Sequence, residues 1–159
     1  MNVAKGFTKN RESGFTMIEL MIAMGILVAL AGVGVPEFRE YKIRANIART
    51  AEEMKGFSSG FVAYTIENED YPNDTHIVLP AGMSEFIGPD AWLQETPLGG
   101  SYNWEGPDNY PYAGISIFQR TAPLSAIISL DKMLDDGNLI TGQFRIGTNG
   151  RPTYVIEDN

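Results

Sequence analysis

The segment Gly14-Phe15-Thr16-Met17-Ile18-Glu19 opens an uncharged run of 16 residues that extends from Leu20 to Val35. A carboxylate within a membrane-length apolar segment costs roughly 2.5–3.5 kcal/mol, so Glu19 needs a partner or a specific role. A helix over Phe15 to Val35 would be about 31 Å long at about 1.5 Å per residue. This length matches a hydrocarbon core of about 30 Å. The segment therefore has the length and the apolarity for one membrane crossing.

The residues before this segment are basic and lack an apolar core of their own. They include Lys5, Lys9 and Arg11. A secretory signal places an apolar region of roughly 7–15 residues ahead of its cleavage site. Here the plausible processing point precedes the apolar run and lies between Gly14 and Phe15. Cleavage at this point would leave the hydrophobic helix on the mature chain.

This arrangement resembles the prepilin leader of type IV pilins and of the pseudopilins of type II secretion. The resemblance rests on the basic leader, Gly14, Phe15, Thr16, Glu19 and the apolar continuation, together with Pro36, 22 residues into the predicted mature chain. It implies that a prepilin peptidase cuts after Gly14 and N-methylates Phe15. It also implies that Glu19 meets the N-terminal amine of a neighbouring subunit. The alternatives are an ordinary membrane anchor, and a Glu19 that reaches the cytoplasmic headgroups.

Charge is distributed unevenly along the chain. Residues 1–14 carry a net charge of +2, whereas residues 68–159 carry −9. The positive-inside rule then predicts a cytoplasmic N-terminus and an extracytoplasmic head. An acidic head is a poor partner for nucleic acid, which is bound largely through Lys and Arg. The chain has no Cys, so packing and hydrogen bonds must close the C-terminal region that many pilins close with a disulfide.

One long helix is predicted from Phe15 to about Asn68. Beyond the apolar run, a stripe of residues at helical spacing faces one side, and charged residues fill the others. Pro36 lacks an N–H to bond back to Gly32, so a kink is predicted there. The predicted stripe consists of Phe38, Tyr41, Ala45, Ala48, Ala51 and Met54.

The remaining residues predict an antiparallel sheet of about four strands, which gives an α+β fold with the sheet packed on the long helix. Tyr102 and Trp104 would alternate inward after the turn at Pro97 and Gly99-Gly100. Asn149-Gly150 predicts a hairpin in which Phe144 and Ile146 face Tyr154 and Ile156. The other expected elements are a short strand at 76–79, a helical turn at Met83–Ile87, a strand at 113–119 and a helix at about 123–134. The predicted domains are a leader (1–14), a transmembrane half-helix (15–36), an amphipathic half-helix (37–68) and a head (69–159).

No catalytic arrangement is evident, and neither a metal nor another cofactor is predicted. His76 is the only histidine, and with Asp74 it is interpreted as a pair of solvated loop side chains. Asp135, Asp136 and Asn138 could suggest calcium, but helix capping is the preferred interpretation. Pseudopilins of type II secretion have a calcium loop near the C-terminus, whereas residues 147–152 here contain no acid.

The resemblance implies a structural subunit, a pseudopilin or minor pilin, in an inner-membrane-rooted helical filament of a type II secretion or type IV pilus system. Its partners would be homologous subunits, the prepilin peptidase, an inner-membrane assembly platform and membrane lipid. The assembled filament would be periplasmic or on the cell surface. The alternative is a single-pass, membrane-anchored binding module or enzyme that does not polymerise. Secretion, pilus and competence systems, and major and minor subunits, remain open at this point.

Overall fold

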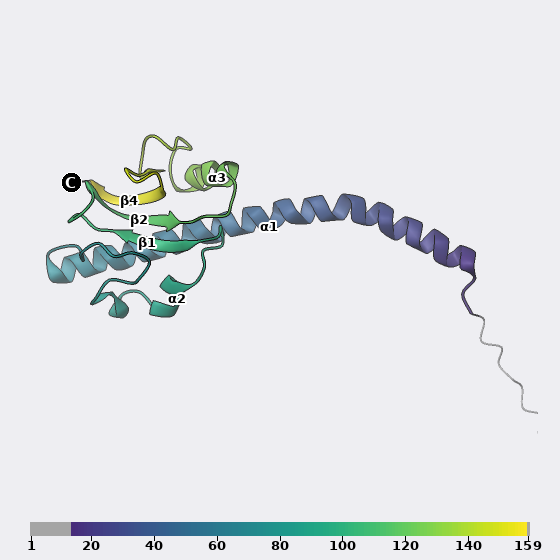
Figure 1. The fold of residues 1–159 in the computed structure, drawn as a ribbon, viewed down its shortest axis with the longest axis horizontal. Coiled ribbons are helices and arrows are strands. Elements are labelled where there is room, and N and C mark those ends of the chain that lie inside the picture. Colours follow the sequence, from purple (N-terminus) through teal and green to yellow (C-terminus); the bar gives the residue numbers. More distant parts are fainter. Residues whose placement is uncertain (1–13, 159) are drawn as a thin grey trace, which may run out of the picture. The chain divides into compact units, whose positions relative to one another are not determined.

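The computed structural model describes residues 14–158, so residues 1–13 of the predicted leader lie outside the described residues. The chain divides into two compact units, residues 1–40 and 41–159. The elements are α1 (Met17–Asn68), η1 (Met83–Glu85), α2 (Pro89–Leu93), β1 (Ser101–Glu105), β2 (Tyr112–Phe118), α3 (Leu124–Leu134), β3 (Phe144–Ile146) and β4 (Pro152–Asp158) (Figure 1).

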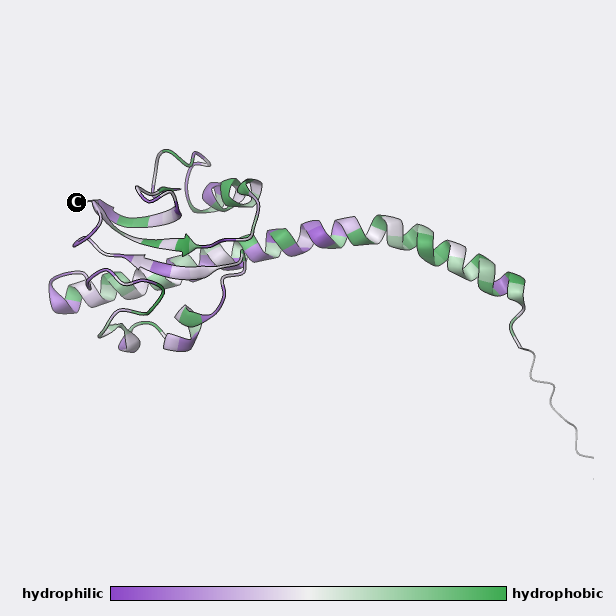
Figure 2. Cartoon of the chain, viewed as in Figure 1, coloured by the Kyte–Doolittle hydropathy of each residue, from purple (hydrophilic) through white to green (hydrophobic). Residues whose placement is uncertain are grey.

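The first part of α1 is apolar and has no cover within its own chain. Within the described residues, one stretch of α1 is long and apolar enough to cross a membrane, with a mean hydropathy of 2.3. None of that stretch is buried, and Met21 and Val28, for example, are 71% and 73% exposed. Figure 2 shows hydrophobic colouring along this part and a mixture of polar and apolar residues further on. Such a surface needs lipid or other apolar side chains around it.

The head contains the predicted four-stranded antiparallel sheet, in the order β1-β2-β4-β3. The C-terminal strand β4 therefore lies between β2 and β3 and pairs with both. Trp104 in β1 pairs with Ile115 in β2, and both side chains are fully buried. Tyr102 is buried as well, which confirms the predicted inward alternation of Tyr102 and Trp104. The helix predicted at about 123–134 is also confirmed, as α3.

The core forms where the second part of α1 packs on the sheet and on α2. Met54 and Phe61 of α1 are fully buried. The ring of Phe61 stacks on that of Trp104, with centroids 3.7 Å apart, and meets Trp92 of α2 edge-on at 5.6 Å. Phe57 meets Tyr102 edge-on at 5.0 Å. Aromatic pairs of this kind contribute beyond the area they bury.

The buried part of the predicted stripe of α1 is shorter than the stripe itself. Phe38 and Tyr41 are 67% and 70% exposed, and Ala45 is also exposed. The first buried position is Ile47, next to Asn46, whose Nδ2 donates to Pro97 O at 2.8 Å. Helical spacing identifies a face of the helix, but it does not show how far the covering elements extend along it.

Two predictions about strands were wrong. Residues 76–79 form no strand, because Ile77 has a positive φ of 66° and the backbone turns sharply there. Only an isolated bridge between Thr75 and Trp104 remains. In the C-terminal hairpin Phe144 does pair with Tyr154, but Ile146 pairs with Pro152. Residues 147–151 form a longer loop than a two-residue Asn-Gly turn, and Gly147 N donates to Arg151 O at 2.8 Å.

Hydrogen bonds around a buried carboxylate close the C-terminal region. Glu105, at the end of β1, has no exposed area. Its Oε2 accepts from the Tyr112 hydroxyl at 2.9 Å, and its Oε1 accepts from Asn149 Nδ2 at 2.6 Å. Thr153 and Arg151 approach the same carboxylate at 3.4 and 3.7 Å. One acidic side chain thus ties β1, β2 and the C-terminal hairpin together without a disulfide.

Candidate processing and assembly site

The predicted processing residues lie immediately before the first turn of α1. Gly14 and Phe15 are exposed and precede the helix, which begins at Met17. A Cβ added at Gly14 would meet no atom within 4 Å. The backbone at the predicted cleavage point is therefore accessible within the described part of the chain.

Thr16 and Glu19 form a capping box that opens α1. The Thr16 backbone N–H donates to Glu19 Oε2 at 2.8 Å, and the Thr16 hydroxyl donates to the same oxygen at 2.9 Å. In return, the Glu19 N–H donates to Thr16 Oγ1 at 3.3 Å. A Ser or Thr followed three residues later by Glu or Gln is the sequence signature of this motif. The sequence analysis missed it, although the spacing was sufficient to identify it.

This capping box satisfies orphan backbone donors that would otherwise face an apolar environment. The carboxylate also lies near the positive end of the helix dipole, which favours an acid at that position. Both hydrogen bonds from Thr16 use Oε2, so Oε1 of Glu19 has no hydrogen-bond partner among the described residues. One oxygen orders the helix start, and the other is available to an external donor.

Pro36 lies inside α1, and the helix continues through it to Asn68. The structure thus shows that the helix does not end at Pro36, and the predicted kink stays a prediction. Gly14, Phe15 and Glu19 are close neighbours along the chain, whereas Pro36 is about five turns further along the helix at about 3.6 residues per turn.

His76 and Asp74 do not form a pair. His76 Nδ1 lies 2.9 Å from Asn103 Oδ1, and the imidazole meets the Phe118 ring edge-on. Asp74 instead accepts from Asn109 Nδ2 at 3.1 Å and from Gly106 N at 3.3 Å. His76 is exposed and Asp74 is half-buried, so both are loop side chains in contact with solvent, as predicted, but they bind different parts of the head and do not pair with each other.

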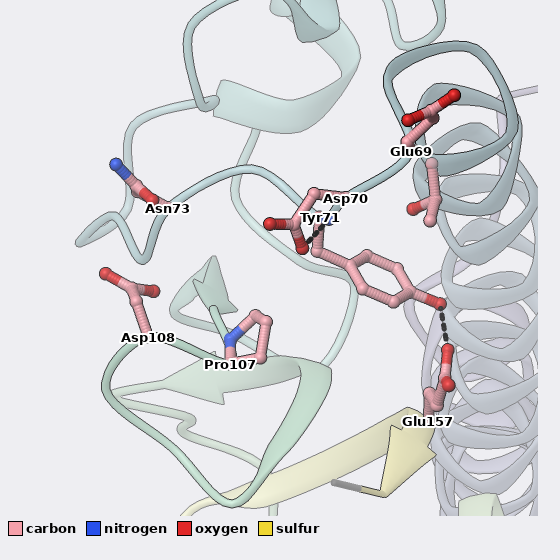
Figure 3. A pocket seen from close by; sticks show the side chains of 8 residues that line it. Glu69, Asp70, Tyr71, Asn73, Pro107, Asp108 and Glu157 are labelled. Carbon is pink, nitrogen blue, oxygen red and sulfur yellow. Dashed lines mark hydrogen bonds between the residues drawn. The ribbon is translucent and has the colours of Figure 1, made fainter.

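A pocket of about 440 Å³ opens beside the C-terminal end of α1 (Figure 3). The Tyr71 ring extends toward Glu157, and its hydroxyl donates to Glu157 Oε2 at 3.1 Å. Burial, followed by the hydrogen bond to Glu157 and its charge, raises the pKa of Tyr71, so this phenol is no general base near neutral pH. None of the lining residues is basic: they are Thr65, Glu69, Asp70, Tyr71, Asn73, Pro107, Asp108 and Glu157. The pocket suits a cationic group rather than an anion.

The acids that follow α3 cap the helix end and order the loop after it. Asp136 accepts from Asn138 N at 2.7 Å and from the Thr141 hydroxyl at 2.9 Å. Asp135 accepts from the backbone N–H of Gln143. Asp135 is the C-cap residue of α3, and its backbone N–H donates to Asp131 O at 2.6 Å, so the capping interpretation is confirmed at Asp135. In the last turn of α3, burial and then the charge of Asp136 raise the pKa of Asp131.

Comparison with known proteins identifies the N-terminal segment most clearly. The family model of the prokaryotic N-terminal methylation motif matches residues 9–35. A fimbrial protein of Neisseria meningitidis serogroup B (strain ATCC BAA-335 / MC58) is 31% identical over 77 residues, 48% of this chain and 45% of the relative. The type IV major pilin protein PilE of Neisseria gonorrhoeae is 33% identical over 77 residues, 48% of this chain and 46% of the relative. A fimbrial protein of Pseudomonas aeruginosa is 29% identical over 69 residues, 40% of this chain and 45% of the relative.

The chain thus matches somewhat less than half the length of these relatives. Among solved structures, the major type IV pilin PilA1 from Clostridium difficile aligns with a TM-score of 0.49 at 14% identity, over 73% of this chain and 97% of that one. The chain thus contains the prokaryotic N-terminal methylation motif at residues 9–35 and is similar to fimbrial proteins and type IV major pilins, which supports a type IV pilin-like family.

Proposed function

We propose that the chain is a structural subunit that a prepilin peptidase cleaves between Gly14 and Phe15 and methylates on Phe15. The subunit is then anchored in the inner membrane by residues 15–36 and polymerises with homologous subunits on an inner-membrane assembly platform. The observation that carries the proposal is the arrangement at the start of α1. An accessible Gly14-Phe15 bond directly precedes a capped helix whose membrane-length apolar stretch is entirely exposed.

The exposed apolar surface supports assembly through α1. Before assembly, lipid covers the side chains of residues 17–35; in a filament, the corresponding helices of neighbouring subunits replace it. Transfer between two apolar environments has little hydrophobic driving force, so packing and polar contacts decide the association. A charged group that is buried between the helices therefore has an important effect on their association.

Glu19 is the polar group placed to supply such a contact. Its Oε1 has no partner among the described residues, while the capping box holds its Oε2 in place. Cleavage after Gly14 would create an amine at Phe15, and this amine on an adjacent subunit is a donor of opposite charge. A charged pair in low dielectric is stabilised only when both partners are present. Glu19 would therefore fix the axial position of each added subunit.

A pilus subunit is favoured over a secretion pseudopilin. The relatives are named as fimbrial proteins and type IV major pilins. The loop of residues 147–151 also lacks the acids that a pseudopilin calcium loop would need. The basic residues before Gly14 favour a cytoplasmic N-terminus and an extracytoplasmic head.

The test is the N-terminus of the mature protein, determined by mass spectrometry on membranes from cells that express the full chain with a prepilin peptidase. We expect a chain that begins at Phe15 and carries one added methyl group, and we expect the full-length form when the peptidase is absent. A chain that retains Met1 in the presence of the peptidase would contradict the proposal. It would favour a membrane-tethered module that does not polymerise.

A further inference from the structure

Asp131, in the last turn of α3, is a buried acid without a hydrogen-bond partner. Its side chain has no exposed area, and neither carboxylate oxygen has a donor in full hydrogen-bond geometry within the described part of the chain, although the backbone N–H of Gly137 is near enough to lower its pKa. Buried polar groups in native proteins are nearly always paired, and a buried unpaired carboxylate is especially costly. The structure contains no other buried side-chain oxygen or nitrogen in this condition among residues 14–158. Asp131 therefore requires a specific explanation.

Two further carboxylates converge on Asp131. One oxygen each from Asp131, Asp135 and Asp136 lies within 4.8 Å of the others. Calcium binds oxygen at about 2.3–2.6 Å, so two ligands on one ion are separated by at most about 5 Å. The three carboxylates are thus already close enough to bind the same ion.

No cationic side chain among the described residues forms an ion pair with these acids. The nearby Arg145 pairs with Asp158 instead. The acids also lie at the C-terminal end of α3, where the helix dipole is negative and disfavours a carboxylate. Mutual repulsion and the dipole therefore act against three charged side chains here, and burial acts against the charge of Asp131 as well. A bound cation would reverse each of these unfavourable contributions.

The loop that follows α3 holds two of the acids in fixed positions. Asp136 accepts from Asn138 N and from the Thr141 hydroxyl, as described above. Gly142 approaches Asp135 so closely that a Cβ there would lie 1.7 Å from Asp135 Oδ2. These contacts engage both oxygens of Asp136, and the backbone N–H of Gln143 engages Oδ2 of Asp135, so Oδ1 of Asp135 accepts none of them. They do not neutralise the negative charge.

We propose that Asp131, Asp135 and Asp136 form a calcium site between the end of α3 and the loop that precedes β3. Calcium is favoured because it takes six to eight oxygen ligands in flexible geometry, including backbone carbonyls. The last carbonyls of a helix generally lack an intrahelical partner, although at the end of α3 the carbonyl of Asp131 accepts from Asp135 N. Magnesium requires stricter octahedral geometry and shorter distances of about 2.0–2.1 Å. The absence of His and Cys from the cluster argues against zinc.

The site would stabilise the junction between α3 and the sheet. It is separate from the residues 147–151, which contain no acid, and from the N-terminal processing site. In an extracytoplasmic module, affinities of about 10⁻⁴–10⁻³ M are usual for calcium. An affinity in this range would leave the site occupied where calcium is at millimolar concentration.

The experiment uses the full chain in detergent micelles after treatment with a chelator. Calcium chloride is titrated by isothermal calorimetry, and the unfolding temperature of the head is followed by near-ultraviolet circular dichroism with and without calcium. We expect one saturable site and an unfolding temperature that rises with calcium. Magnesium chloride at the same concentrations should give a much smaller shift.

Asp131→Asn removes the buried charge but keeps the shape, and Asp136→Asn provides a second variant that changes an exposed position. Each should weaken calcium binding at least tenfold, and Asp131→Asn should unfold at a higher temperature than wild type in the absence of calcium. Asp90→Asn, on α2, is the matched control and should bind calcium as wild type does. The proposal is overturned if no saturable binding is seen below about 10 mM calcium, well above the range usual for extracellular modules. It is equally overturned if Asp131→Asn and Asp136→Asn bind like wild type, or if magnesium acts as strongly as calcium.

Discussion

The hydroxyl of Tyr102 donates a hydrogen bond of 2.7 Å to Glu53 Oε2 and so joins β1 to α1. Tyr102 is almost completely buried, and Arg49 holds the other oxygen of Glu53 at 2.7 Å. Burial, followed by the hydrogen bond to Glu53 and its charge, raises the pKa of Tyr102 far above its ordinary value. The packing of the long helix on the sheet therefore depends on a protonated phenol.

This relationship predicts a loss of stability at alkaline pH. The pKa of Tyr102 is higher in the folded chain than in the unfolded chain, where it is about 10. The contribution of Tyr102 is therefore fully present below about pH 10 and decreases as the pH rises above that value. In Tyr102→Phe, the free energy of unfolding should fall by about 1–2 kcal/mol near neutral pH, and its further decline at alkaline pH should be shallower. Chemical denaturation at several pH values measures both effects.

Tyr41→Phe is the matched control for this prediction, because Tyr41 is 70% exposed. It should leave both the stability and its pH dependence unchanged. An alkaline slope in Tyr102→Phe equal to that of wild type would show that other groups control the high-pH transition.

Glu105 should be one of the most sensitive acids in the head. Glu105→Ala leaves Tyr112 and Asn149 without their acceptor and should lower the free energy of unfolding by about 3 kcal/mol. Glu105→Gln keeps an acceptor oxygen and should cost less. Glu95→Ala, at an exposed position, should be close to neutral. Denaturation of the three variants ranks these costs, and an equal effect at positions 105 and 95 would mean that the carboxylate does not hold the C-terminal hairpin.

Two glycines one turn apart on α1 should respond in opposite directions. A Cβ at Gly60 would lie 2.6 Å from Ile87 Cγ1, whereas a Cβ at Gly56 would meet nothing within 4 Å. Gly56→Ala should stabilise the head by about 0.5–1 kcal/mol through helix propensity. Gly60→Ala gains the same propensity but forces a core displacement that costs about 1–3 kcal/mol, so a net loss is expected. Thermal unfolding of both variants measures these changes in stability. A stabilised Gly60→Ala would contradict the close packing of α1 on residues 86–87.

Gly14→Leu should block processing without disturbing the fold. The structure leaves open space at Gly14, so the added side chain meets nothing in the chain itself. The effect would arise in the peptidase, because a side chain at the cleavage position prevents the chain from entering the active site of the enzyme. Mass spectrometry of membranes should show the unprocessed chain. Gly25→Leu, also at a position with open space, is the control and should be processed normally, so a mature form of Gly14→Leu would count against the cleavage site.

Two substitutions at Glu19 separate its roles in capping and in assembly. Glu19→Gln keeps an oxygen for the capping box but removes the charge, whereas Glu19→Ala removes both. If the charge meets an amine of the next subunit, both variants should insert normally and both should lose incorporation into filaments, measured by crosslinking or by shearing. Normal incorporation of Glu19→Gln combined with a defect in Glu19→Ala would show that capping alone accounts for the acid.

The features that the sequence predicted well depend on neighbouring residues. The apolar surface of the first part of α1 follows from composition alone. The capping box was not predicted, although it too needs only Thr16 and Glu19, which lie three positions apart. The alternation of Tyr102 and Trp104 likewise reflects the two faces of one strand. Each of these is decided by backbone periodicity or by a local hydrogen bond, so the order of residues contains the necessary information.

The features that only the tertiary structure decided depend on contacts between distant segments. The Tyr102–Glu53 bond joins residues 49 positions apart, and Glu105 meets Thr153 across 48 positions. Helical spacing alone placed Phe38 and Tyr41 in the packed stripe, although the covering elements begin near Asn46. The burial of Asp131 arises in the same way. A helical pattern predicts that an acid is exposed to solvent, and only the loop after the helix covers it in the folded chain. Sequence order specifies which face a residue occupies, but the docking of the other elements on that face decides which charges are removed from water.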